Sequence, residues 1–234
     1  MYYIMNITWM DDGFSVSVQA KEVAVRLYIN PISPNSRKVR AVARHVGVDV
    51  EEVVVDRKAG EQRTDAFLAK SPNGMVPLLE DGGGFLFESN AIAVQLADRP
   101  GSPLALTESS WRAQTLQWLA WEGCHLAPPV LDLAFERAIK PMLGPADPDP
   151  ATVERSLAGY ARFGAVLDRQ LAGHTFLLGE AVGVADFCLA ACFTFADASG
   201  LPLSDTPQVQ RWLRALDEVP AWRDTAPPGM ASRQ

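Results

Sequence analysis

The order of apolar patterns between residues 25 and 97 constrains the fold of this chain more than any other feature. Short apolar runs at 25–29 and 50–55 predict two strands. Between them, residues 34–46 carry apolar or small side chains at intervals of three and four, which predicts an amphipathic helix that ends at Gly47. Because a helix crosses between the two strands, the strands must run parallel.

The same segment continues with a second helix, a hairpin and a third helix. A polar stretch with two apolar side chains predicts a helix at about 62–70, and apolar runs at 76–80 and 84–87 flank a glycine turn that indicates a hairpin. Residues 89–97 then predict a helix with one apolar face. In this interpretation residues 25–100 form an α/β domain.

Beyond residue 100 the pattern changes to helices alone. A linker at 101–109 is rich in proline, glycine and serine. Helices are expected at 110–126, with a break at Pro128 and Pro129, then up to about Lys140, and at 151–173, 183–200 and 205–222. Residues 110–225 therefore predict an all-α helical domain. Residues 1–24 match neither domain, and an appended strand, a flexible extension and a mistaken start codon are all open.

The composition excludes several classes of protein. The 234 residues are 48% hydrophobic and 21% charged, an ordinary profile for a soluble globular protein. A net charge of -7 without a basic run argues against nucleic acid as a partner, because phosphate backbones need clustered Lys and Arg. The longest apolar stretch, 187–196, is about half the ~20 residues of a membrane-spanning helix. With no secretory signal visible, we expect a cytoplasmic protein without a membrane partner.

The cysteines and histidines do not indicate a metal site. Cys124, Cys188 and Cys192 show no CxxC spacing. Because Cys188 and Cys192 lie one helical turn apart, they predict a pair on one buried face. The three histidines are far apart in sequence and have no ligand spacing, so we expect no metal.

The first of three candidate motifs is Ser33-Pro34-Asn35-Ser36, which follows the first strand. Ser33 fits an N-cap with Pro34 at the first helical position, a purely structural role. A hydroxyl beside free N–H groups at the positive end of a helix also stabilises a thiolate. One such charge-assisted hydrogen bond is worth ~1.5–3 kcal/mol, enough to lower a thiol pKa of ~8.5 by roughly one to two units.

The second and third motifs are Met75-Val76-Pro77, which opens the hairpin, and Glu88-Ser89, which precedes the third helix. A trans bond before Pro77 fits a plain edge strand, whereas a cis bond would turn the backbone of Val76 toward a ligand that pairs like an added strand. Ser89 fits a helix cap, and the first turn of its helix offers a site for a carboxylate. Taken singly, each motif is also explained as a cap or a turn.

In order and spacing, the three motifs resemble those of the cytosolic glutathione transferase family, of its serine type. The segment FLLGEAVGVADFCLA resembles the family's approach to a buried helix with a fixed aspartate, here Asp186, and the resemblance runs from Val25 to about Trp222. It implies a thioredoxin-like N-terminal domain that holds glutathione as co-substrate. It also implies an all-helical domain that shapes the pocket for an electrophile, and a homodimer.

The resemblance also implies roles for single residues. Ser33 matches the hydroxyl that activates the glutathione sulfur, with Asn35 or Ser36 in support, and Tyr28 ranks below Ser33 because it lies inside the strand. The implied glutathione-binding residues are Met75, Val76 and Pro77 for the cysteinyl part, Glu88 and Ser89 for the γ-glutamyl group, and Arg57 and Lys58 for the glycyl carboxylate.

Trp118, Trp121 and His125 share one face of a helix in the second domain. Such a stripe favours a core or a dimer interface over a substrate pocket. In the family, however, the pocket side of this helix faces the catalytic serine, so the three residues are candidate substrate-pocket residues as well.

Two departures from the family pattern affect the interpretation. Cysteine-type relatives, which exchange thiols, carry Cys at the start of the first helix; the first domain here has no cysteine, so disulfide reduction is disfavoured. Three residues before Asp186 the family has Ser or Thr, and here the position is Gly183. The missing hydroxyl affects stability by a few tenths of a kcal/mol rather than function.

The leading hypothesis is a glutathione S-transferase that attacks a small apolar electrophile. A glutathione-dependent isomerase or dehalogenase on the same fold is the alternative among enzymes. A non-catalytic interaction module is the alternative outside them. The electrophile, the dimer geometry and the role of residues 1–24 are not readable from the sequence.

Overall fold

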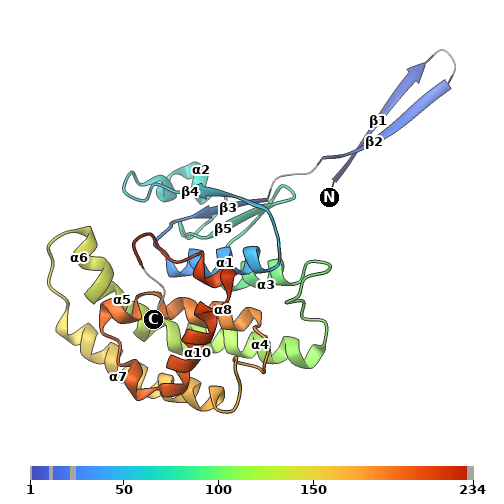
Figure 1. Ribbon diagram of the computed structural model, residues 1–234. Coiled ribbons are helices and arrows are strands. Elements are labelled where there is room, and N and C mark those ends of the chain that lie inside the picture. Colours follow the sequence, from blue (N-terminus) through green and yellow to red (C-terminus); the bar gives the residue numbers. More distant parts are fainter. Residues whose placement is uncertain (1, 11–12, 22–24, 231–234) are drawn as a thin grey trace. The chain divides into compact units, whose positions relative to one another are not determined.

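The computed structural model describes residues 2–10, 13–21 and 25–230. The chain forms two compact units, drawn in Figure 1. The first combines residues up to Asn30 with Asp49–Glu88, and the second combines Pro31–Val48 with residues from Ser89 onward. The expected domain boundaries, 25–100 and 110–225, stay a prediction.

The first unit contains a four-stranded mixed sheet in the order β4-β3-β5-β6. Strand β3 (Val25–Ile29) pairs in parallel with β4 (Val50–Val54), as the crossing helix required. On its other edge β3 pairs antiparallel with β5 (Leu78–Asp81), and β5 continues into β6 (Gly84–Leu86) as the predicted hairpin. Gly82 and Gly83 have φ of 59° and 82°, which suits a residue without Cβ at the turn.

Between β4 and β5 the predicted helix is shorter than expected. A 3₁₀ turn, η1 (Glu61–Arg63), precedes helix α2 (Asp65–Leu68), and Thr64 separates them with extended backbone (φ -70°, ψ 148°). The hydroxyl of Thr64 accepts the N–H of Phe67 and so caps α2. Phe67 anchors this segment in a small core with Val55 and Leu78.

Residues before the sheet form a separate hairpin. Strands β1 (Tyr2–Met10) and β2 (Gly13–Lys21) pair antiparallel from Tyr2↔Lys21 to Met10↔Gly13. The sequence left an appended strand open here, and the structure contains a strand pair.

In the second unit, helix α1 (Pro34–His45) packs against α3 (Ser89–Ala97) and α8 (Val184–Ala191). Helix α8 is buried on all sides, as its apolar sequence predicted, and Cys188 and Cys192 are both buried. Burial raises the pKa of the Cys188 thiol to about 12. These thiols therefore stay protonated, and the prediction of a buried pair is confirmed.

The remaining helices of this unit follow the sequence pattern in outline. They are α4 (Ser109–Trp121), α5 (Ala127–Ala134), α6 (Lys140–Leu143), α7 (Pro150–Leu171), η4 (Cys192–Phe195), α9 (Ala196–Ser199), η5 (Leu203–Asp205), α10 (Pro207–Asp217) and α11 (Pro220–Arg223). The predicted last helix is divided before Pro220, where Val219 is extended.

The predicted break at Pro128 and Pro129 is wrong, because the chain stays helical through both prolines. A π-helical turn, η2 (Glu122–Leu126), joins α4 to α5 and ends with the Ala127 N–H donating to the Glu122 carbonyl, five residues back. The prolines then occupy the first turn of α5, where a missing N–H costs little. A second π turn, η3 (Phe135–Ile139), precedes Pro141 in the same way.

Asp186 fixes the segment that leads into α8. Its carboxylate accepts the N–H groups of Leu177 (2.8 Å) and Gly183 (2.8 Å) and the indole N–H of Trp212 (2.7 Å). Burial raises the pKa of Asp186 to about 6, against the effect of these donors. Gly183 is the N-cap of α8 and has no hydroxyl to offer. The Asp186 side chain still accepts the backbone N–H of Gly183, so half of the capping box is kept without the Ser or Thr.

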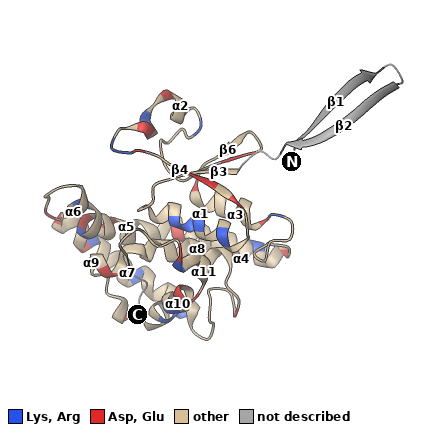
Figure 2. Ribbon diagram, turned by 45° about the horizontal axis from the view of Figure 1, so that its top comes forward, with Lys and Arg blue, Asp and Glu red and all other residues tan. Residues whose placement is uncertain are grey.

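Basic residues on α1, blue in Figure 2, tie this helix to the C-terminal segment. The guanidinium of Arg37 lies 3.6 Å from the ring centroid of Trp222 and donates to the Trp222 carbonyl at 3.4 Å. About two α-helical turns further along the same side, Arg44 donates to the Asp224 carbonyl at 2.9 Å. The C-terminal segment therefore braces the helix that begins at Ser33.

Helices α5 and α7 pack tightly against each other at Gly159. A Cβ on Gly159 would lie 2.7 Å from Cβ of Pro129 and 3.1 Å from its Cγ, and a proline ring cannot rotate away. Gly159 is therefore required by packing, although glycine is a poor helix former.

This close approach predicts opposite effects at two glycines. We expect Gly159→Ala to lower the free energy of unfolding by about 1–3 kcal/mol through overpacking. Gly123→Ala is the matched control, because its Cβ would meet no atom within 4 Å. It should raise stability by about 0.5–1 kcal/mol. Urea unfolding of both variants checks this, and equal effects at the two sites would refute the packing argument.

Candidate active site

The start of α1 has the geometry of an anion site. Ser33 is extended (φ -76°, ψ 125°), and its Oγ accepts the N–H of Ser36 at 3.3 Å, so it is the N-cap, with Pro34 as first helical residue. The first turn carries no acidic side chain. Because the Ser33 oxygen accepts this bond, its proton is still available to a ligand. Ser33 and Asn35 are half-buried, whereas Ser36 is fully buried.

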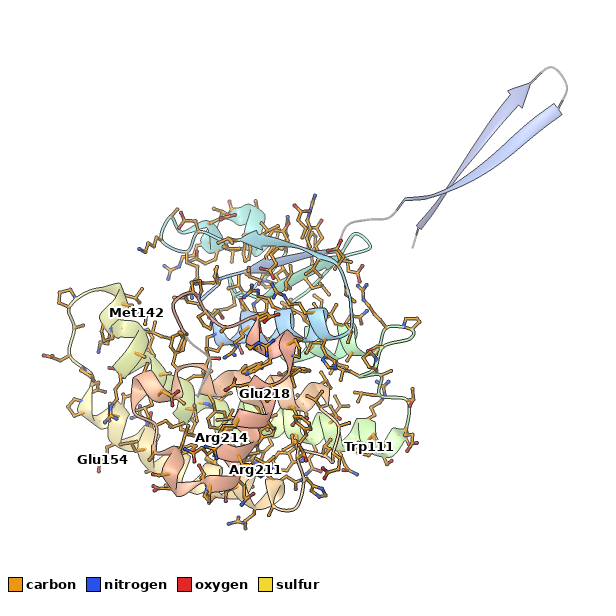
Figure 3. All side chains as sticks on the ribbon, in the orientation of Figure 1. Trp111, Met142, Glu154, Arg211, Arg214 and Glu218 are labelled. Carbon is orange, nitrogen blue, oxygen red and sulfur yellow. The ribbon has the colours of Figure 1, made fainter. Side chains whose placement is uncertain are left out.

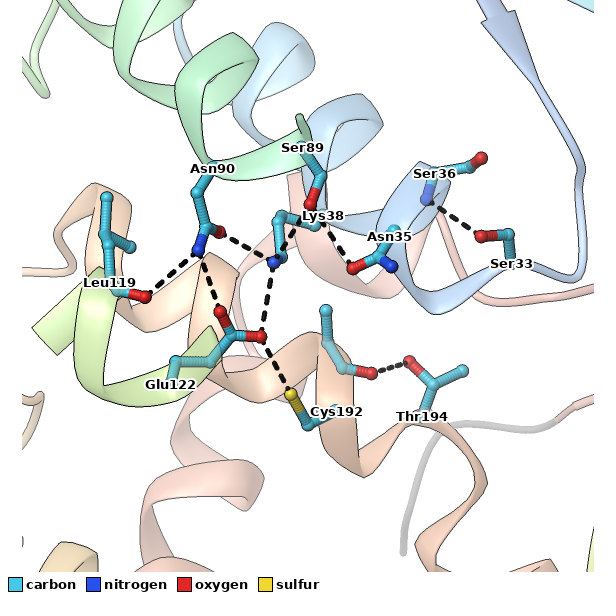
Figure 4. A network of polar contacts seen from close by, with 11 residues as sticks. Ser33, Asn35, Ser36, Lys38, Ser89, Asn90, Leu119, Glu122, Cys192 and Thr194 are labelled. Carbon is cyan, nitrogen blue, oxygen red and sulfur yellow. Dashed lines mark hydrogen bonds and ion pairs between the residues drawn. The ribbon is translucent and has the colours of Figure 1, made fainter. Parts of the chain in front are cut away.

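A buried lysine lies one turn further along α1 (Figure 4). The ammonium of Lys38 donates to Asn90 Oδ1 at 2.7 Å, to Ser89 Oγ at 3.2 Å and to Glu122 Oε1 at 3.4 Å. Only 1% of Lys38 and 2% of Glu122 are exposed. Burial opposes the charge on Lys38, but the Glu122 carboxylate and nearby groups outweigh it and raise the pKa of Lys38. The ammonium is therefore charged within the protein interior.

Glu122 is the acceptor at the centre of this polar network. Besides Lys38, it accepts the side-chain amide of Asn90 at 2.8 Å and the thiol of Cys192 at 3.1 Å. The network reaches the start of α1 through Ser89, whose hydroxyl donates to Asn35 Oδ1 at 3.3 Å. Two predicted site residues, Asn35 and Ser89, thus lie together, and one ion pair holds α1, α3, η2 and η4 around them.

Sequence reasoning assigned no function to Lys38, Asn90 or Glu122. No local sequence signal marked them: Lys38 lies on a helix whose residues 36–39 and 41–43 are all buried, and only the structure shows this burial. A lysine among buried neighbours needs a carboxylate partner, because an unpaired buried charge is costly.

The predicted glutathione-binding residues of the first unit lie at the hairpin and in the loop before η1. The Val76–Pro77 bond is cis. Pro77 is buried, Val76 packs on the core of this unit, and Met75 is 63% exposed. Arg57 and Lys58 are exposed on the loop after β4.

Glu88 has the unusual backbone conformation among these residues. Its φ is 73°, and it is the one described non-glycine residue with positive φ between 25 and 230. A left-handed conformation costs a non-glycine residue roughly 1–3 kcal/mol and is found mainly at functional sites. Glu88 is exposed and directly precedes Ser89.

Tyr28 already has two partners. Its phenol donates to Glu80 Oε2 at 2.7 Å and accepts from the ammonium of Lys70 at 3.2 Å. Both of these contacts lie within the first unit. The phenol of Tyr28 is thus engaged in two hydrogen bonds, and its rank below Ser33 as a sulfur-activating group stays a prediction.

Trp121 and His125 pack against Phe163 of α7, and Trp118 packs against Trp121. The Trp118 and Trp121 rings are 5.0 Å apart, and Phe163 lies 6.3 Å from Trp121 and 5.1 Å from His125. Trp118 is 8% exposed, Trp121 is half-buried and His125 is exposed. Packing between helices accounts for these contacts, and a role in the pocket stays a prediction.

No group of three or more His, Cys, Asp or Glu side chains within the described ranges is arranged to hold a metal ion. None of the helices within those ranges combines the length and apolar character needed to cross a membrane.

Comparison with known proteins agrees with the fold and the motifs. Residues 23–98 match the family model of the glutathione S-transferase N-terminal domain, and residues 150–215 match that of the C-terminal domain. Glutathione S-transferase 3 of Zea mays is 33% identical over 208 residues, which cover 86% of this chain and 92% of the relative. Glutathione S-transferase GstB of Escherichia coli K12 is 30% identical over 82% of this chain and 92% of its own length.

A solved structure extends the comparison. A glutathione transferase family member from Pseudomonas fluorescens, crystallised with two glutathione molecules bound, is 28% identical. It aligns with a TM-score of 0.73 over 87% of this chain and 92% of that protein. The fold class predicted from the sequence, a thioredoxin-like domain followed by a helical domain, is confirmed by these matches. This chain belongs to the glutathione S-transferase family.

Proposed function

We propose that this glutathione transferase conjugates glutathione to a small apolar electrophile and that Ser33 donates a hydrogen bond to the glutathione thiolate. The observation that carries the proposal is the start of α1, where a capping hydroxyl retains a free proton beside a helix N-terminus without acidic residues. The helix dipole and the hydroxyl both favour the thiolate over the thiol.

The reaction follows from that stabilisation. The thiol of glutathione loses its proton to solvent, and the thiolate is held by the hydrogen bond from Ser33. Its sulfur lone pair then forms a C–S bond to the electrophilic carbon, and a leaving group such as chloride departs with the electron pair of the broken bond. The part of Ser33 is to raise the fraction of thiolate at neutral pH.

Glutathione itself would be held by the other predicted residues. The backbone of Val76, beside Met75 and Pro77, suits the cysteinyl part, and the strained Glu88 together with Ser89 suits the γ-glutamyl group. Arg57 and Lys58 offer charge for the glycyl carboxylate, and Asn35 and Ser36 support the turn at Ser33. The glutathione bound to the relative from Pseudomonas fluorescens supports this choice of co-substrate.

Lys38 supports this site from inside the protein. It donates to both Ser89 and Asn90, so it fixes the start of α3 relative to α1 within the second unit. Its own charge is balanced by Glu122. Lys38 is therefore a positioning residue, and the hydroxyl of Ser89 is the group that would meet the ligand.

We further propose a homodimer in the cytoplasm, with no metal, no nucleic acid and no membrane as partner. Trp118, Trp121 and His125 are the proposed lining of the electrophile pocket or, as their packing favours, part of the helical core.

The role of Ser33 predicts a kinetic loss that capping does not explain. Ser33→Ala should lower kcat/KM for glutathione with chlorodinitrobenzene about 10- to 100-fold, because one charge-assisted hydrogen bond of ~1.5–3 kcal/mol disappears. Steady-state kinetics at neutral pH measure the loss. Turnover equal to that of the unchanged protein would rule Ser33 out.

A matched control separates catalysis from capping. Thr64 also caps a helix, accepting the N–H of Phe67 at 3.3 Å, the same distance as in the Ser33 cap. Thr64→Ala should cost about 1 kcal/mol of stability, as Ser33→Ala should, but leave kcat/KM within about twofold. A similar kinetic loss in both variants would assign the effect to stability.

Because Lys38 and Glu122 form a buried ion pair, we expect their substitutions to have strongly non-additive effects on the free energy of unfolding. Lys38→Met leaves Glu122 buried without its cation and should lower the free energy of unfolding by about 3–5 kcal/mol. The double variant Lys38→Met, Glu122→Met should recover most of that loss, because no charge is left uncompensated. Denaturant unfolding of the three proteins measures the coupling.

The double variant also tests the positioning role. Because it lacks the Lys38 donor to Ser89, its KM for glutathione should rise several-fold while its stability stays near that of the unchanged protein. Unchanged KM in a stable double variant would show that Ser89 needs no help from Lys38.

A further inference from the structure

The hairpin of β1 and β2 lies before the part of the chain that matches the glutathione S-transferase family, which begins at residue 23. The two strands, labelled in Figure 1, form a two-stranded sheet of their own that is not hydrogen-bonded to the sheet β4-β3-β5-β6. The proposed reaction uses none of these residues. Because a two-stranded hairpin alone is at best marginally stable in water, it needs a further surface to pack on.

The register of the hairpin places apolar residues opposite apolar residues at every second position. Directly opposite residues share a face of a sheet, and the face alternates from one residue to the next. One face therefore consists of the four cross-strand pairs Tyr3↔Ala20, Met5↔Val18, Ile7↔Val16 and Trp9↔Phe14. These eight residues are the apolar hairpin face.

The opposite face of the hairpin has a different composition. Each of its pairs includes a polar residue or a glycine, and the pairs Asn6↔Ser17 and Thr8↔Ser15 are polar on both strands. Such an alternation is typical of an antiparallel sheet with one face in water and the other against an apolar surface. The apolar hairpin face therefore indicates a contact with another molecule or another part of the chain.

The charge of this segment argues against a membrane as that contact. Residues 1–24 contain three acidic residues, Asp11, Asp12 and Glu22, and one basic residue, Lys21. Membrane surfaces are commonly anionic, and the amphipathic segments that bind them are rich in Lys and Arg. An excess of acidic residues is repelled by such a surface, so the observations favour a protein surface.

The exposed apolar side chains elsewhere in the described chain are scattered. They are spread over several elements, among them β4, β6, α4 and α6. In the second unit, Trp111 (46% exposed) and Met142 (61% exposed) lie on opposite sides in Figure 3. Apolar side chains exposed in this way are normal on a protein surface and do not match a continuous face of eight residues.

A second copy of the chain meets the requirements of symmetry and area. A two-fold interface brings the same patch of two copies together, so the patch must not repel itself. The apolar hairpin face has no charged residue, although the whole chain carries a net charge of -7. Its three aromatic residues, at ~150–250 Å² each when covered, would bury roughly 450–750 Å² per copy, close to the ~800 Å² per partner of a stable interface.

We propose that the apolar hairpin face is a contact between two copies of this chain, in which the two hairpins pack face to face about a two-fold axis. Sheets packed in this way lie ~10 Å apart and bury both inner faces. Pairing through strand edges would instead leave the apolar hairpin face in water. The contact depends neither on Ser33 nor on glutathione, so its test is separate from that of the reaction.

The test places a charge near the middle of the apolar hairpin face in the full chain. Ile7 belongs to one of the two central pairs, so a charge there meets its counterpart across the axis. Ile7→Lys and Ile7→Glu should each weaken self-association at least tenfold, because like charges then face each other. An equimolar mixture of the two variants should associate about tenfold more tightly than either alone, because Lys then faces Glu. Sedimentation velocity over a dilution series measures all three.

Asn6→Lys is the matched control, because Asn6 is the neighbour of Ile7 in β1 and lies on the opposite face. It should leave self-association within about twofold, and a thermal melt checks that each variant is folded. The unchanged protein should stay in the supernatant when vesicles of phosphatidylcholine and phosphatidylserine are sedimented. The proposal is overturned if the Ile7 variants associate like the unchanged protein, if Asn6→Lys weakens association equally, if the mixture shows no recovery, or if the protein sediments with the vesicles.

Discussion

The buried ion pair between Lys38 and Glu122 is the interaction on which the second unit and its site depend. It joins the helix that begins at Ser33 to the helix that begins at Ser89, and it reaches the segment after α8 through Cys192. Burying two charges is expensive unless every donor and acceptor is satisfied. Here Asn90 donates to Glu122 and accepts from Lys38. These hydrogen bonds offset part of the cost of removing the two charges from water.

Such a pair specifies one arrangement of helices more strongly than apolar packing does. Apolar side chains tolerate small shifts, whereas a lysine with three acceptors within 3.4 Å does not. The consequence for function is local. Ser89 is held in a fixed position beside Asn35, and the start of α1 is braced from the other side by the arginine contacts to the C-terminal segment.

The order of strands and helices in the first unit and the cap of α1 could be predicted from the sequence, because each depends on residues close together in the chain. The β3–α1–β4 crossover follows from apolar spacing, and the cap at Ser33 follows from a serine before a proline at a helix start. The glycine turn between β5 and β6 was visible for the same reason.

The continuous helix through Pro128 and Pro129, the short α2 and the buried ion pair could not be predicted, because they depend on contacts that a local sequence pattern does not show. A π turn changes the hydrogen-bond register by one residue, so the helix survives Pro128 and Pro129 although proline is normally a break. Thr64 shortened α2 because a capping hydroxyl competes with the helix. Lys38 and Glu122 are 84 positions apart and polar, so each was expected at the surface until the other was known to be beside it.

The proposed thiolate site at Ser33 lies at the start of a helix in an acidic protein, and its N-terminus and hydroxyls suit an anion without a basic patch. The most direct measurement of this account is the pKa of the glutathione thiol in its complex with the protein, followed by the ultraviolet absorbance of the thiolate. We expect it about one to two units below the ordinary ~8.5 for the unchanged protein and near ~8.5 for Ser33→Ala. Equal thiol pKa values in the two complexes would contradict the assignment of Ser33.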